Sequence, residues 1–187
     1  MKNNFKIILV LTVVCLICGF LLSFVFSAAK AKIDENQTKA IYRGFSIIAS
    51  NFDTAEEETV GTKTVYKLYD SGHALIGYAY LAEGQGYGGT IKILFALDPQ
   101  LEKLLGIEIV ESVETPGLGS RINEESFKGQ FRNLITSGEI ECVKSVPEKN
   151  NEVQAITSAT ISSRAVVHIV NKGIDELKTI LKEEGIR

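Results

Sequence analysis

Residues 153–164 read VQAITSATISSR and decide how the end of the chain folds. Hydroxyl side chains gather within this stretch: Thr157, Thr160, Ser162 and Ser163. After it, apolar residues recur every three or four positions through Ala165–Leu181, which predicts an amphipathic helix packed on a core. Serine and threonine ahead of such a run are typical helix N-caps, and an N-cap alone would explain them. A helix start also offers unpaired N–H groups and a positive dipole end, so a phosphate site is the second interpretation of the stretch.

Two glycine-rich loops precede this stretch, EGQGYGGT at 83–90 and ETPGLG at 114–119. The first holds four glycines around Tyr87 and suits a wide hairpin, because glycine clusters are ordinary turn chemistry. No Gly-Lys-Ser/Thr follows it, which excludes a nucleotide P-loop. In the second loop Pro116 fixes its own φ, while Gly117 and Gly119 permit unusual backbone angles and close approach by a ligand.

Between residues 65 and 110, short segments rich in β-branched and aromatic residues are separated by glycine or aspartate turns. They predict a meander of strands over Val65–Tyr69, Ala74–Leu81, Ile91–Leu97 and Leu105–Val110. Further on we expect a short helix over Phe127–Ile135, a strand over Ile140–Val143 and a polar loop over Lys144–Asn151. With another helix expected over Ile33–Phe52, the fold class is α+β, a single mainly antiparallel sheet flanked by helices.

The N-terminal region carries an uncharged apolar run of 23 residues, Ile7–Ala29. At about 1.5 Å per residue, a helix of this length crosses the roughly 30 Å hydrocarbon core of a bilayer. A cleaved signal peptide is the alternative, because Ser27-Ala28-Ala29 resembles a cleavage site. The apolar region of a signal peptide is usually only about 7–15 residues, so the length favours an uncleaved transmembrane helix. We therefore expect an anchor at 1–29, a membrane-proximal helix and linker at 30–59, and a domain at 60–187.

Beyond the anchor the chain is acidic and lacks the residue pattern of a metal centre. Without Lys2 and Lys6, 18 of the 20 basic residues remain against 23 acidic ones, a net charge of −5 for residues 30–187. This balance does not suggest a nucleic-acid surface. His73 and His168 have no metal-ligand spacing, and Cys142 is the one cysteine beyond the anchor. The pattern argues against a protein-bound metal and excludes an intradomain disulfide.

Residues 154–160 resemble the flavinylation motif of the FMN-binding domain that the G subunit of the Rnf complex shares with the C subunit of the Na⁺-translocating NADH:quinone reductase. The family pattern is Asp-x-x-Ser/Thr-Gly-Ala-Thr, whose last threonine carries FMN through a phosphoester bond. Thr157, Ala159 and Thr160 match this pattern. Gln154 stands where the family usually has Asp, and Ser158 where it usually has Gly. GYGG at 86–89, ETPGLG at 114–119 and then Gln130-Phe131 resemble the same family in the same order.

The resemblance implies an electron-carrying subunit of an Rnf-type complex, which couples electron flow between ferredoxin and NAD to translocation of Na⁺ or H⁺. It implies FMN held covalently by Thr160, with no catalysis by the chain alone. Further cofactor contacts are expected from Thr157, Ser158, Ala159, Glu114, Thr115, Gly117, Leu118 and Gly119. The expected partners are other membrane and iron–sulfur subunits and a flavin transferase, with the chain in the cell (inner) membrane.

Two other interpretations stay open at this point. The C subunit of the Na⁺-translocating NADH:quinone reductase shares the domain and its chemistry, although it is usually longer than 187 residues. A membrane-anchored binding module that has lost its flavin also fits the sequence. Gln154 lacks the charge of Asp, and the Cβ of Ser158 restricts a turn that Gly would leave free.

We predict a single-pass anchor with residues 30–187 outside the cytoplasm, because Ile7–Ala29 can span a bilayer without burying a charge. Protease added to intact spheroplasts should then degrade the domain. Full protection would reverse this topology, and a mature protein that starts near Lys30 or Lys32 would show a cleaved signal peptide instead.

Overall fold

The computed structural model describes residues 2–183 and 185, and its contacts divide the chain between Ala40 and Ile41. Both sides of this division belong to one helix, α1, which runs from Lys2 to Ile48. Its apolar part is long enough to cross a membrane by length and composition, with a mean hydropathy of 3.0. The separate helices expected at 7–29 and 33–52 are therefore one helix, because no glycine or proline interrupts residues 28–43. This helix ends at Ile48, so residues 49–52 of the second expected helix lie outside it.

The domain boundaries expected at 29/30 and 59/60 remain predictions. Residues 184, 186 and 187, at the end of the predicted domain, lie outside the described part of the chain.

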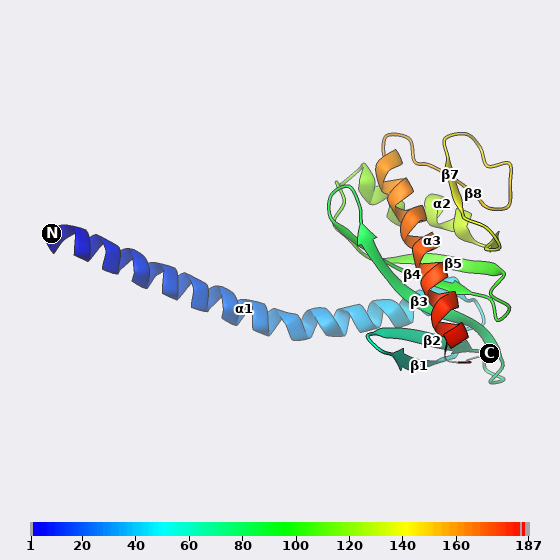
Figure 1. Ribbon diagram of the computed structural model, residues 1–187, viewed down its shortest axis with the longest axis horizontal. Helices are drawn as coiled ribbons and strands as arrows, with labels where there is room; N and C mark the ends of the chain where they lie inside the picture. Colours follow the sequence, from blue (N-terminus) through cyan, green and yellow to red (C-terminus); the bar gives the residue numbers. More distant parts are fainter. Residues whose placement is uncertain (1, 184, 186–187) are drawn as a thin grey trace. The chain divides into compact units, whose positions relative to one another are not determined.

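Residues 41–187 are built on a six-stranded antiparallel sheet in the order β1-β2-β3-β4-β5-β6 (Figure 1). The strands are β1 (Thr54–Val60), β2 (Lys63–Tyr69), β3 (Leu75–Gln85), β4 (Thr90–Leu97), β5 (Lys103–Ser112) and β6 (Leu134–Ile135). β2 to β5 confirm the predicted meander, and sequence-consecutive strands are neighbours throughout the sheet. The α+β fold class predicted from the sequence is confirmed.

β1 is an edge strand that pattern reasoning missed. It pairs with β2 alone and carries three consecutive glutamates, Glu56, Glu57 and Glu58, in place of an apolar strand pattern. Two of these carboxylates are held by side chains of β2: the Tyr69 hydroxyl donates to Glu56 at 3.0 Å, and Lys67 Nζ lies 2.7 Å from Glu58. Cross-strand partners of this kind stabilise a strand whose own residues give no hydrophobic signal.

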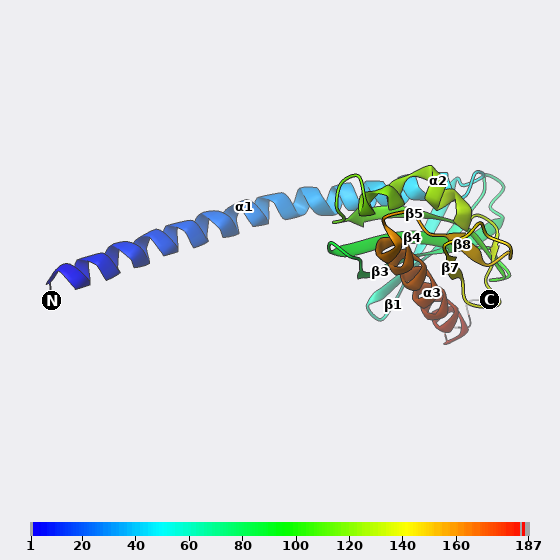
Figure 2. The ribbon, with the colours of Figure 1, turned by 90° about the horizontal axis from the view of Figure 1, so that it is seen from above.

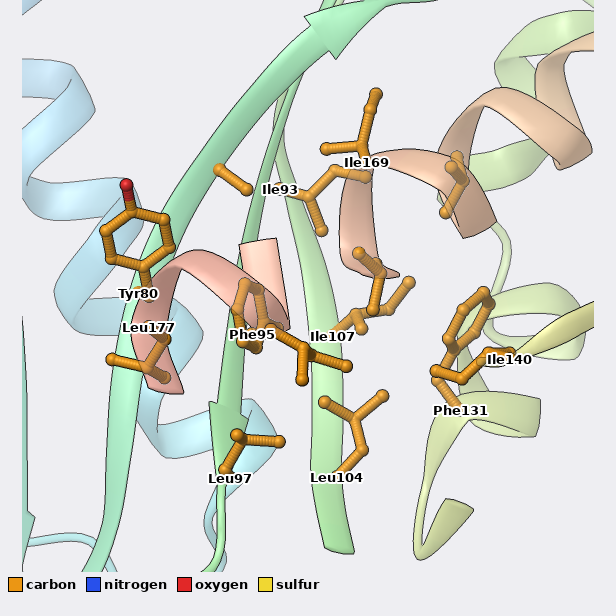
Figure 3. Packing of buried hydrophobic residues seen from close by; sticks show 14 of the residues in the cluster. Tyr80, Ile93, Phe95, Leu97, Leu104, Ile107, Phe131, Ile140, Ile169 and Leu177 are labelled. Carbon is orange, nitrogen blue, oxygen red and sulfur yellow. The ribbon is translucent and has the colours of Figure 1, made fainter. Parts of the chain in front are cut away.

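A helical layer covers each face of the sheet within residues 41–187. α3 (Thr160–Glu183) crosses β3 and β4 on one face, as Figure 1 and Figure 2 show. Residues 41–48 of α1 pack on the other face, with Phe45 fully buried. β4 lies between the two layers, and its alternating side chains enter both cores: Phe95 toward α3, and Leu94 and Ala96 toward α1. Figure 3 shows Phe95 and Leu177 in the core beneath α3.

The single helix expected over Phe127–Ile135 is wrong. The structure has η1 (Gly119–Asn123), α2 (Glu125–Lys128) and η2 (Gly129–Phe131), and then strand β6. Phe127 and Phe131 are four residues apart and pack edge to face at 5.5 Å, which imitates a helical period. The helical turns end after Phe131, because Arg132 is extended and Asn133 has a φ of 63°.

A second, two-stranded sheet precedes α3. β7 (Glu141–Val143) confirms the strand expected at 140–143, and it pairs in parallel with β8 (Glu152–Gln154). The polar residues 144–151 form the loop between these strands. β8 leads directly into the hydroxyl-rich stretch that opens α3.

We predict that Gly173→Val lowers the free energy of unfolding by about 1–3 kcal/mol, the usual cost of overpacking a core. A Cβ at Gly173 would lie 2.7 Å from Phe95 and 2.8 Å from Ala82, where α3 meets the sheet. Gly138→Val is the matched control, because a Cβ there would meet nothing within 4 Å. Urea unfolding of the full chain in mild detergent measures both variants. Equal stability of the two would contradict the close packing of α3.

Candidate functional site

The first turn of α3 is braced from inside the protein by Ser163. Its backbone N–H and its hydroxyl both donate to the Ala159 carbonyl at 3.0 Å, and its hydroxyl accepts the Ile156 N–H at 3.0 Å. Ser163 is fully buried, so this residue serves the loop rather than a ligand. The expected N-cap is therefore displaced: Ala159, which has no hydroxyl, precedes the helix, and Thr160 is its first residue.

The first backbone hydrogen bond of α3 is donated by Ser163. Three residues precede it in the helix: Thr160, Ile161 and Ser162. N–H groups at these positions have no carbonyl partner within a helix. They and the positive end of the helix dipole can receive an anionic group. The Thr160 side chain is half-buried at the same point.

The loop before Thr160 turns through Ser158, whose φ is 70°. This is the left-handed region that glycine adopts readily and other residues at a cost. The family motif usually has Gly at this place, and the structure gives the physical reason. Ser158 is exposed, so the cost lies in the backbone and not in crowding of the side chain.

The ETPGLG loop is a compact turn that leads into η1. The Thr115 carbonyl accepts the backbone N–H groups of Leu118 at 3.2 Å and Ser120 at 3.1 Å. Gly117 has a φ of 75° and donates its N–H to the Ser120 hydroxyl at 2.9 Å. A Cβ at Gly117 would meet nothing within 4 Å, so its left-handed φ, and not a close neighbour, favours glycine there.

Glu114 joins this turn to the glycine-rich hairpin and to α3. One carboxylate oxygen, Oε1, accepts the N–H of Tyr87 at 2.7 Å and of Gly88 at 3.3 Å. The other, Oε2, accepts the hydroxyl of Ser162 at 3.0 Å. Three segments that are far apart in the sequence therefore meet at one buried carboxylate.

A cavity of about 430 Å³ opens where these segments meet. It is lined by uncharged residues: Tyr87, Thr115, Leu118, Gly119, Ser158, Ala159, Thr160, Ile161 and Ser162. Six of the predicted cofactor residues are thus brought together: Thr115, Leu118, Gly119, Ser158, Ala159 and Thr160. Three lie outside the lining: Glu114 behind the wall, Gly117 on the exposed turn, and Thr157 on the exposed loop.

Three residues of the cavity wall were not among the predicted cofactor contacts. Ser162 belongs to the hydroxyl-rich stretch that the sequence singled out, whereas Tyr87 and Ile161, whose side chains are 67% and 61% exposed, were missed. Tyr87 could have been found, because it sits in the GYGG loop that was singled out for its glycines. No sequence feature marks Ile161 as a wall residue, since an isoleucine beside an apolar helix pattern is predicted to be buried in the core.

The Gln130 side chain forms two hydrogen bonds with the backbone of Gln154 in β8. Its side-chain oxygen accepts the Gln154 N–H at 2.7 Å, and its amide nitrogen donates to the Gln154 carbonyl at 3.4 Å. The side-chain amide of Gln130 thus makes the two backbone hydrogen bonds that a neighbouring strand would make with Gln154. The Gln154 side chain, which stands at the Asp position of the motif, reaches the Lys144 carbonyl at 3.4 Å.

A larger cavity, of about 500 Å³, lies between α3 and strands β2 and β3, and most of its charged groups are paired at Glu176. Lys63 Nζ lies 2.8 Å from Glu176, and the Tyr80 hydroxyl donates to Glu176 at 3.0 Å. The hydrogen bond from Lys63 holds the pKa of Glu176 below its usual value. None of the predicted cofactor residues lines this cavity, and among residues 2–183 and 185 no cluster of His, Cys, Asp or Glu could hold a metal.

Sequence and structure comparisons show which known proteins this chain resembles. Residues 86–175, which contain all three segments, match the FMN-binding domain family. The solved structure of the C subunit of the Na⁺-translocating NADH-quinone reductase from Parabacteroides distasonis is similar, with a TM-score of 0.59 and 20% identity over 77% of this chain and 91% of that one. NqrC from Shewanella oneidensis gives a TM-score of 0.54 at 16% identity, over 70% of this chain and 73% of that one. These two show that the chain shares the fold of those C subunits.

Two relatives resemble the chain over nearly its whole length. The G subunit of the proton-translocating ferredoxin:NAD⁺ oxidoreductase complex of Clostridium ljungdahlii is 30% identical, over 90% of this chain and 89% of the relative. The G subunit of the ion-translocating oxidoreductase complex of Methanosarcina acetivorans is 28% identical, over 93% and 94% respectively. The chain therefore belongs to the G-subunit family of ion-translocating oxidoreductase complexes, the Rnf-type FMN-binding proteins.

We predict that Ser158→Gly raises the free energy of unfolding by about 0.5–1 kcal/mol. A left-handed φ costs a non-glycine residue roughly 1–2 kcal/mol, partly offset by the greater entropy of glycine in the unfolded chain. Urea unfolding in detergent measures the change, with an unchanged m-value. Ser137→Gly is the control, since Ser137 is exposed and has no positive φ, and it should lower stability or leave it unchanged. A lower free energy of unfolding in Ser158→Gly would contradict the proposal that the left-handed backbone of Ser158 is strained.

Proposed function

We propose that this chain is the electron-carrying subunit of a membrane-bound, ion-translocating oxidoreductase complex, and that it holds FMN covalently at Thr160. The single observation that carries the proposal is the uncharged cavity at the open start of α3, with Thr160 in its wall. Full-length similarity to the G subunits supports the assignment to such a complex over the quinone reductase, whose related structures share only the fold.

The residues present fit FMN. Its phosphate group would lie at the first turn of α3, where the N–H groups of Thr160, Ile161 and Ser162 precede the first helical hydrogen bond. The flavin ring is flat and largely apolar, and Tyr87 and Leu118 offer exposed apolar surface in the same wall. When bound, FMN supplies the electron-accepting chemistry that no side chain of the cavity offers.

Attachment to Thr160 would require a separate flavin transferase. A threonine hydroxyl is a weak nucleophile unless a base activates it. No residue in the cavity lining is a histidine, lysine or carboxylate. The chain's own contribution is to present a half-buried hydroxyl beside an anion-binding helix start, which the transferase can reach.

The apolar part of α1 would anchor this protein in the membrane, with residues 30–187 on the extracytoplasmic side. Covalent attachment would then keep the cofactor from being lost where no cytoplasmic flavin pool replaces it. The other membrane and iron–sulfur subunits of the complex would supply and accept the electrons.

We predict that the chain, expressed with its transferase and export route, keeps yellow flavin fluorescence through denaturing electrophoresis. Thr160→Ala should abolish this fluorescence, and Thr160→Ser should keep it by restoring a hydroxyl. Thr157→Ala is the matched control, because Thr157 is exposed, close in sequence and outside the cavity wall. Ser163 would make a poor control because its hydroxyl braces the loop.

Fluorescence that survives Thr160→Ala would place the linkage at another residue. A correctly exported wild-type chain without fluorescence would instead support the flavin-free binding module.

A further inference from the structure

Glu114 is a buried carboxylate that lies behind the cavity wall rather than in it. It is 8% exposed, and its two oxygens together accept the three hydrogen bonds from Tyr87, Gly88 and Ser162. All three donors are uncharged groups. Because an ionised group strengthens each hydrogen bond it accepts, one carboxylate can join three segments more firmly than a neutral side chain could.

The protein is shaped to admit this carboxylate. A Cβ at Gly86 would overlap Glu114 Oε1, and a Cβ at Gly119 would overlap Oε2 and lie 2.8 Å from the Ser162 hydroxyl oxygen. A glycine thus stands against each oxygen, one from the hairpin and one from the turn. Glycine is therefore required at positions 86 and 119 because a Cβ would overlap the carboxylate, and not because of a left-handed φ.

No lysine or arginine forms an ion pair with Glu114 among the described residues, in contrast to its neighbours along the chain. Glu108 lies 2.6 Å from Lys128, and Glu111 lies 2.8 Å from Lys92. In the part of the chain that the structure describes, the Glu114 carboxylate is therefore met by neutral N–H and O–H donors and not by a cation in direct contact. It is separated from the cavity by Gly119 and Ser162, both of which line the wall.

From this geometry we propose that Glu114 is a positioning residue with a second, electrostatic role. It assembles the flavin cavity by holding three segments together, and it places an uncompensated negative charge behind the wall that lowers the reduction potential of the bound flavin. This inference rests on the proposed function, since it concerns the FMN attached at Thr160. It adds the residue that tunes the cofactor.

The electrostatic part follows from charge repulsion. Electrons that arrive on the flavin add negative charge to it. A fixed carboxylate nearby opposes that addition, and its effect is strong because the intervening protein has a low dielectric and little screening by salt. A neutral amide of the same shape can still accept the Tyr87 and Gly88 N–H groups with its oxygen and donate its NH2 to the Ser162 hydroxyl oxygen, and it removes the opposition.

The test compares Glu114→Gln with wild type in the full chain, co-expressed with its transferase and purified in detergent. Redox titration followed by flavin absorbance should show an upward shift of the midpoint potential in Glu114→Gln, with flavin attachment retained. Glu111→Gln is the matched control, because it removes a nearby charge that is exposed and already paired with Lys92, and its potential should equal that of wild type. An unchanged potential in flavin-bearing Glu114→Gln would overturn the electrostatic role.

The positioning role has a readout that needs no flavin. In chains expressed without the transferase, amide hydrogen exchange at Tyr87 and Gly88 should speed up in Glu114→Ala and stay near wild type in Glu114→Gln. Glu114→Asp separates the two roles if the amide variant does not fold: its shorter reach should speed exchange, while its retained charge should leave the potential near the wild-type value. Unchanged exchange in both Glu114→Ala and Glu114→Asp would overturn the positioning role. Failure of the wild type to carry flavin would refute the proposed function instead, so the two are distinguishable.

Discussion

The close contact between α3 and the sheet is the constraint on which the rest of the domain depends. Two glycines omit side chains where these layers meet: Gly173 on α3 against Phe95, and Gly84 on β3, where a Cβ would lie 2.6 Å from Ile169. Packing at this distance leaves α3 little freedom to slide or tilt, since protein interiors are filled to crystal-like density. The position of the helix on β3 and β4 sets where its first turn lies. That turn then stands beside the β3–β4 hairpin and the loop after β5, where the cavity forms.

The division of labour within the cavity follows from this arrangement. Backbone N–H groups at the helix start offer places for an anion, while the apolar side chains offer a surface for a ring. Hydroxyl groups that look equivalent in the sequence have different tasks. Ser163 braces the loop, Ser162 meets Glu114, and Thr160 alone combines partial exposure with a place at the first helical position. Residues outside the cavity wall, such as Gln130, hold the strand that delivers this turn.

Much of the fold could be predicted because its strands and its last helix have apolar residues at the expected period. β1 could not, since the pairing of Glu56 and Glu58 with side chains of β2 appears only once the strands are adjacent. The Phe127–Phe131 spacing misled for a related reason: two aromatic rings can pack four residues apart without a continuous helix. For the site, motif resemblance identified most of the cavity wall. The role of Glu114 could not be read from its neighbours in sequence, because its partners lie 26 to 48 residues away.

The edges of the sheet have a consequence for how two copies of this protein can meet. At one edge β1 presents consecutive carboxylates, and at the other β6 is only two residues long. β6 pairs with only Lys103 and Leu104 of β5, so the two edges differ in how they are protected. A second copy that approached along β1 would set glutamates against glutamates. The carboxylates of β1 therefore oppose strand pairing between copies at this edge, and each domain is left to meet its partners through other surfaces.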